Sequence, residues 1–119
     1  METIAKYQRK AFLKDHPPVL ARALLGSTGS EQTLLAGTVL GIKEDGKQYA
    51  YSGDGDDMEA RSILAEDVTI PASGDKYALT YVHCDAVAAE LIWDDSVSAA
   101  GQYDALDELH SNGIYAAEA

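Results

Sequence analysis

The sequence has one cysteine, Cys84, among its 119 residues. A single cysteine cannot form a disulfide within the chain, and it cannot supply the several thiolates of a cysteine-based zinc site. The sequence also lacks any apolar run approaching the ~18–20 residues that a membrane-spanning helix needs. No apolar stretch follows the first charged residues, so we expect no secretory signal. These absences predict a soluble protein made in a reducing compartment.

Basic residues are scarce as well: nine lysines and arginines stand against twenty acidic residues, a net charge of −11. Residues 1–22 carry five bases and two acids, a net charge of +3, whereas residues 23–119 carry a net charge of −14. Nucleic-acid phosphates and anionic lipids repel such an acidic body, so we expect neither nucleic acid nor a membrane as a partner.

The mass of 12.7 kDa permits one domain. His16-Pro17-Pro18 stops any helix, because proline removes an amide donor and restricts the residue before it. We therefore divide the chain into a flexible basic N-terminal arm, residues 1–18, and a single domain, residues 19–119.

After the prolines, short apolar segments alternate with turn residues. Residues 19–25 predict a strand or a short helix, and residues 33–42 predict an extended segment. Asp45-Gly46 is a strong turn signal, and with residues 48–51 it predicts a hairpin. Another loop at residues 52–61 precedes an apolar segment at residues 62–70. This spacing is typical of a compact β-rich domain.

Two more strands are expected further along. The alternation in residues 76–83 places Tyr77, Leu79, Tyr81 and His83 on one face. A tight connection at Cys84-Asp85 then leads into a strand at residues 86–93. On this second strand the residues expected to share a face are Val87, Ala89, Leu91 and Trp93.

Near the end of the chain, residues 103–110 have helical spacing, with Tyr103, Leu106 and His110 near one face and Leu109 beside them. Asn112-Gly113 predicts the end of this helix, and a last short extended segment follows. The predicted fold class is therefore mainly β, with one short C-terminal helix.

No pattern indicates a metal or cofactor site. The acidic loop at residues 54–59 suggests calcium, but an EF-hand loop starting at Asp54 needs glycine where Glu59 stands and glutamate where Ala65 stands. A solvated turn is expected there instead, with a weak cation site as the alternative. The three histidines, His16, His83 and His110, are far apart in the sequence and have no metal-ligand spacing.

No pattern indicates catalysis either. Asp94 and Asp95 are adjacent, so on a strand their carboxylates diverge rather than converge on one substrate atom. Cys84 and His83 diverge for the same reason, and a partly buried structural thiol is expected. We expect Trp93 to be a core or interface aromatic residue. The sequence predicts a protein that is not an enzyme.

In order, LLAGTVLGIKEDGKQYAY, an acidic turn, ARSILAEDV and YALTYVHCDAVAAELIW resemble the tailed-phage head decoration family, whose best-known member is the lambda head decoration protein. The matching segments are residues 36–41, 46–51, 54–68, 77–93 and 103–114. Each motif alone consists only of a glycine, a hydrophobic residue and a spacing, so it is weakly specific for the family. The order and spacing of the motifs together are more specific. The resemblance covers residues 32–115.

This resemblance implies a small β domain of the β-clip type that assembles as a homotrimer. Members of the family bind the exterior of the expanded capsid, with the major capsid protein as their partner. There they act as a cement against internal DNA pressure and have no catalytic role. The expected location is the exterior of the virion, after synthesis in the cytoplasm of the bacterial host.

The resemblance further implies that the segment before the domain orders on the capsid. Here Tyr7, Phe12 and Leu13 would be the apolar anchors of the arm. The bases Lys6, Arg9, Lys10 and Lys14 would meet carboxylates on the shell. The arm departs from the family pattern, which is rich in threonine, alanine and glycine, so a merely solvated terminus is the alternative.

Two other functions remain open at this point. The net charge of −14 on residues 23–119 suggests an acidic DNA mimic that inhibits a DNA-binding enzyme. Its acids lie mostly in turns rather than in a helical stripe, which makes this function less favoured. A small hydrolase using Asp94 and Asp95 ranks last, because no convergent triad or metal pattern accompanies them.

Overall fold

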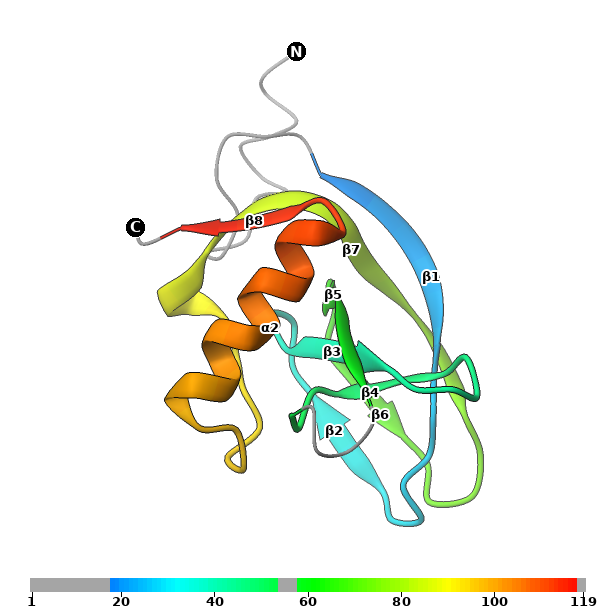
Figure 1. Ribbon diagram of the computed structural model, residues 1–119. Coiled ribbons are helices and arrows are strands. Elements are labelled where there is room, and N and C mark those ends of the chain that lie inside the picture. Colours follow the sequence, from blue (N-terminus) through cyan, green and yellow to red (C-terminus); the bar gives the residue numbers. More distant parts are fainter. Residues whose placement is uncertain (1–17, 54–57, 118–119) are drawn as a thin grey trace.

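A computed structural model describes residues 18–53 and 58–117, and Figure 1 shows their arrangement. These residues form eight strands, one 3₁₀ helix and one α-helix near the C-terminal end, so the predicted fold class, a mainly β domain, is confirmed. In chain order the elements are β1 (Val19–Leu25), β2 (Gln32–Leu34), β3 (Val39–Ile42), β4 (Gln48–Ala50), β5 (Glu59–Leu64), β6 (Val68–Ile70), β7 (Lys76–Val87), η2 (Ala88–Glu90), α2 (Ala99–Ser111) and β8 (Ile114–Ala117).

Five strands form a closed ring of hydrogen-bonded neighbours. The sheet order is β1–β4–β3–β5–β7–β8, and β1 also pairs antiparallel with β7 from Val19↔His83 to Leu25↔Lys76. Because β7 pairs with both β1 and β5, the sheet curls back on itself. β8 lies outside this ring, parallel to the last part of β7. β2 and β6 form a separate two-stranded sheet.

Buried side chains form two hydrophobic cores, since successive residues of a strand point to opposite faces of the sheet. The first core, which we call the β core, joins the ring to the β2–β6 pair. Its members are Ala23, Leu25, Leu34, Leu40, Leu64, Val68, Ile70 and Ala78. Two buried polar residues pair with each other: Ser62 Oγ donates to Gln48 Oε1 at 2.5 Å, as buried hydroxyl groups require.

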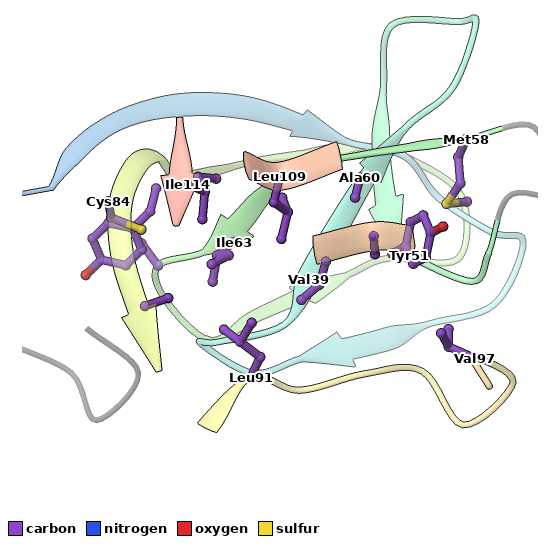
Figure 2. Close-up of a cluster of buried hydrophobic side chains, with 14 residues drawn as sticks. Val39, Tyr51, Met58, Ala60, Ile63, Cys84, Leu91, Val97, Leu109 and Ile114 are labelled. Carbon is purple, nitrogen blue, oxygen red and sulfur yellow. The ribbon is translucent and has the colours of Figure 1, made fainter. Parts of the chain in front are cut away.

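The second core, which we call the helix core, lies between the ring and α2 (Figure 2). Ala105 and Leu109 of α2 are fully buried in it. The other members are Val39, Tyr51, Met58, Ala60, Ile63, Ala65, Tyr81, Cys84, Ala86, Leu91, Val97 and Ile114. Ile63 and Leu64 are neighbours on β5, yet they belong to different cores.

The turn between β3 and β4 confirms the predicted hairpin. Gly46 has φ +82°, a conformation that glycine adopts without steric cost, and its amide donates to the Lys43 carbonyl at 3.0 Å. Lys47 Nζ then reaches Asp75 Oδ2 at 2.8 Å, in the turn between β6 and β7. This ion pair, with the Ser27 amide that also donates to Asp75, holds the pKa of Asp75 below its usual value.

Residues 33–42 were expected to be one extended segment, and this expectation is wrong. A turn separates β2 from β3, because Gly37 has φ +100° and the Thr38 amide donates back to the Leu35 carbonyl at 3.1 Å. The expected loop at residues 52–61 also ends early, since β5 begins at Glu59.

The expectation of a tight connection at Cys84-Asp85 is also wrong. β7 continues to Val87, because Cys84 pairs with Ile114 and Asp85 with Tyr115 of β8. The strand expected at residues 86–93 is therefore absent. Its residues form the end of β7, the 3₁₀ helix and a single bridge between Thr38 and Ile92.

The C-terminal helix is longer than expected and buries a different face. α2 begins at Ala99 because Ser98 caps it, its Oγ accepting from the Gly101 amide at 3.1 Å. Tyr103, expected on one face with Leu106 and His110, is 71% exposed, whereas Ala105 and Leu109 are fully buried. The predicted helix end at Asn112-Gly113 and the short strand after it are confirmed.

Candidate interaction surfaces

The structure brings together no metal site from the candidates that it describes. Residues 54–57 of the acidic loop lie outside the described residues, and so does His16. In the described part of the chain, no three histidine, cysteine or acidic side chains could hold a metal ion. Asp94 Oδ2 instead accepts from the amide and the hydroxyl of Ser96, so this carboxylate shapes a turn.

Cys84 is fully buried in the helix core (Figure 2). Burial raises the pKa of its thiol to about 11, with a smaller contribution from the charge of Asp85. The thiolate is the nucleophilic form, so a thiol with this pKa is inert at neutral pH. The expected structural role of Cys84 agrees with this position.

Two histidines that are distant in the sequence meet at one tyrosine. The ring centroid of Tyr115 on β8 lies 4.8 Å from that of His110 and 6.1 Å from that of His83, both edge-to-face. His83 also packs over Gly113, where a Cβ would come within 2.5 Å of its ring. Through these contacts the end of α2 and the start of β8 pack against β7.

The seven arm residues proposed as capsid contacts, from Lys6 to Lys14, lie outside the described residues. The division into an arm of residues 1–18 and a domain of residues 19–119 stays a prediction. Three surface features of the described residues present apolar side chains to solvent, and we consider each in turn.

The first feature is an exposed row on the β1–β7 pair, which runs along one side of the molecule (Figure 1). We define the ribbon patch as Leu20, Arg22, Tyr77 and Leu79. Arg22 lies opposite Leu79 in the strand register, and its guanidinium carbon is 4.8 Å from the centroid of the Tyr77 ring. Tyr77 is 57% exposed, Leu20 44% and Leu79 40%.

The second feature is a groove between β2 and the segment after η2. We define the β2 groove by its lining residues, Gln32, Thr33, Leu34, Leu35, Thr38, Ala50, Ile92, Trp93, Asp94 and Asp95. Leu35 and Ile92 present exposed apolar side chains to it, and Trp93 is half-buried against the helix core. Both aspartates at its rim are exposed, so the groove combines apolar walls with negative charge.

The third feature is a pocket between η2, α2 and β8. Its lining is formed by Ala88, Ala89, Ala99, Gln102, Tyr103, Leu106 and Ala116. None of these lining residues carries a charge. Tyr103 is 71% exposed, the highest fraction among the large hydrophobic side chains of the described residues.

Sequence reasoning missed the ribbon patch although it placed Tyr77, Leu79 and Tyr81 in one row. The exposed fraction falls along this row from 57% at Tyr77 to 5% at Tyr81, because only its far end reaches the helix core. Alternation identifies a common face but does not say how much of that face another element covers.

Comparison with known proteins identifies the family of the chain. No curated protein matches the chain. No helix of the described residues is long and apolar enough to cross a membrane. The family model of the bacteriophage lambda head decoration protein D matches residues 6–114, a span that includes all seven arm residues named above. The chain therefore belongs to the family of the bacteriophage lambda head decoration protein D, a structural phage head protein and not an enzyme family.

Proposed function

We propose that this protein is a cement for the head of a tailed phage. It binds the major capsid protein on the exterior of the expanded head as a homotrimer, and it stabilises the shell against the pressure of packaged DNA. The observation that carries this proposal is the family match over residues 6–114, nearly the whole chain.

The described surface supports a role in binding rather than chemistry. A cement needs interface area repeated many times, and several exposed apolar side chains lie on the β1–β7 pair and around the β2 groove. A trimer that attaches through three copies of a weak contact gains avidity, because the second and third contacts form at a high effective concentration.

We assign attachment to the basic arm, residues 1–18. Its net positive charge contrasts with the acidic body, so it can meet carboxylates on the shell while the body remains in solvent. An extended segment can add to the edge of a sheet through main-chain hydrogen bonds, with alternate side chains filling pockets. Tyr7, Phe12 and Leu13 supply those apolar side chains.

Co-sedimentation with expanded, undecorated shells of the cognate phage tests the proposal. We expect the protein to sediment with the shells and to raise the temperature at which DNA-filled heads release their genome. A protein that remains in the supernatant at micromolar concentration contradicts the proposal. A pull-down that recovers restriction or repair enzymes instead of capsid protein favours a DNA mimic.

Deleting residues 1–18 tests the role of the arm separately. We expect the truncated chain to keep its folded domain and its trimeric state but to lose binding to the shells. Replacing Phe12 and Leu13 with serine isolates the apolar anchors, and replacing the four lysines and arginines with glutamine isolates the charges. Undiminished binding of the truncated chain rules out the arm as the attachment site.

A further inference from the structure

The ribbon patch and the β2 groove differ in chemistry and lie on different parts of the surface, and the family assignment explains neither. We propose that the ribbon patch of one copy docks into the β2 groove of a neighbouring copy. This inference rests on the proposed homotrimer and names the two surfaces that would form its repeating contact.

The ribbon patch has the composition of an interface centre. It holds an exposed tyrosine, two exposed leucines and an arginine that stacks on the tyrosine, and tyrosine and arginine are enriched among the residues that dominate binding energy. Within residues 18–53 and 58–117, no carboxylate forms an ion pair with Arg22. Its charge is therefore available to a partner.

The β2 groove offers the complementary chemistry. Leu35, Ile92 and Trp93 supply apolar walls, and Asp94 and Asp95 place two carboxylates at the rim. The contact of Asp94 with Ser96 fixes the turn that carries both aspartates. An apolar surface that bears one cation complements this groove in polarity and in charge.

The charges of the two surfaces favour contact between a ribbon patch and a β2 groove over contact between two identical surfaces. Two ribbon patches brought face to face would oppose arginine to arginine, and two grooves would oppose pairs of aspartates. Like charges across an interface cost several kcal/mol, so both symmetric pairings are disfavoured. A contact between two different surfaces is heterologous, and its repetition closes into a ring when the rotation permits. A three-membered ring is the closure that the proposed homotrimer requires.

The net negative charge of the body strengthens this argument. Copies with so many acidic groups repel one another, so association must be concentrated where a cation faces carboxylates. Arg22 is one of five bases in residues 19–119, beside Lys43, Lys47, Arg61 and Lys76. Lys47 is already paired with Asp75 and Arg61 with Glu59.

Sedimentation equilibrium of the full chain provides the first test, with a pair of matched tyrosine variants. We expect Y77S to raise the dissociation constant of the trimer at least tenfold, because it removes the aromatic centre of the ribbon patch. Y103S removes an even more exposed tyrosine from α2, outside both proposed surfaces, and should leave the constant within twofold. Circular dichroism verifies that both variants stay folded.

A charge exchange provides the second test. We expect R22E and D95K each to weaken association at least tenfold, and the double variant R22E/D95K to recover most of the loss. Recovery of association in the double variant requires that residues 22 and 95 face each other across the contact. Misfolding of a single copy would weaken association further and would not restore it. Single variants that associate like the wild type, or a double variant without recovery, overturn the proposed contact.

The outcomes separate this inference from the proposed function. A wild-type chain that stays monomeric overturns both the homotrimer and the interface. A wild-type trimer that tolerates Y77S and R22E overturns the interface alone. A trimer that responds as expected but does not bind shells supports the interface and overturns the cement function.

Discussion

At the scale of single residues, burial controls the chemistry of Cys84. Its thiol is fully enclosed by the helix core, and its pKa is raised from 9.0 to about 11. Between these two values the unfolded chain has lost the thiol proton while the folded chain keeps it. The native state therefore binds more protons in this range, and stability must fall as the pH rises.

We predict that the free energy of unfolding decreases between pH 9 and pH 11 by about 2–3 kcal/mol on account of this thiol. Below pH 9 the contribution is constant. Denaturant titrations of the wild type and of Cys84→Ala at several pH values measure it. Tyr49 and Tyr81, whose pKa values burial also raises, are present in both proteins, so their effect cancels in the difference. Parallel pH profiles would contradict this prediction.

Gly26 is constrained by the ring of Tyr49 rather than by its own backbone angles. A Cβ at this position would lie within 3 Å of two ring atoms and of the hydroxyl oxygen of Tyr49. The ring cannot simply swing aside, because Tyr49 Oη donates to Asp45 Oδ2 at 2.8 Å and Lys43 Nζ lies 4.7 Å from the ring centroid. Glycine is thus required for close packing between β1 and the hairpin.

We predict that Gly26→Ala lowers the free energy of unfolding by about 1–3 kcal/mol through overpacking. Gly74→Ala is the matched control: its Cβ meets only Pro71, at an ordinary 3.9 Å, and its effect should remain within about 0.5 kcal/mol. Chemical denaturation of both variants measures the difference. Equal stabilities of the two variants would show that the Tyr49 ring moves freely.

At the scale of elements, α2 has a side-chain cap at its first turn and a hydrogen bond to β5 near its end. Ser98 caps its first turn, and the Glu108 carboxylate accepts from the Ala60 amide of β5 at 2.8 Å. The second contact joins residues 48 positions apart, so no local pattern could have predicted it. Ala105 and Leu109 of the same helix pack into the helix core.

We predict that Ser98→Ala costs about 1 kcal/mol of stability, because an amide of the first turn loses its acceptor. Ser111→Ala, at the other end of the same helix, serves as the control. The Ser111 hydroxyl donates to the Asp107 carbonyl at 3.3 Å, a contact inside the helix whose loss should change stability by less than about 0.5 kcal/mol. Thermal unfolding followed by circular dichroism distinguishes the two.

At the scale of the whole molecule, the two cores share one set of strands. Ile63 and Leu64 on β5 are both fully buried, but one packs under α2 and the other against the β2–β6 pair. A change in either core therefore acts on the same strand. We expect the domain to unfold as one cooperative unit, as small single domains usually do.

Ile63→Ala and Leu64→Ala test this coupling. We predict that each lowers the free energy of unfolding by about 2–5 kcal/mol, and that each shifts a single transition. Ile63→Val provides a milder control at about 1 kcal/mol. Fluorescence of Trp93 reports on the helix core, and far-ultraviolet circular dichroism reports on the whole sheet. Transitions that separate between these two probes would show that the cores unfold independently.

The sequence predicted elements whose signals are local. Asp45-Gly46 identified the hairpin, and Asn112-Gly113 identified the end of the helix, since glycine tolerates the positive φ that these positions need. It failed at Cys84-Asp85, where no turn forms because β8, some thirty residues further along the chain, pairs with both residues. The local sequence at Cys84-Asp85 therefore gives no signal of the strand pairing that determines its conformation.

By itself, the sequence determined the mainly β character, the contrast between a basic start and an acidic body, and the order of motifs that identifies the family. Only the tertiary structure decided which apolar faces are covered. Tyr77 and Tyr81 belong to one row, and Tyr103 and Leu109 to one helix, yet one of each pair is exposed and the other is buried. Periodicity sets the direction of a side chain, whereas burial depends on which distant element packs against it.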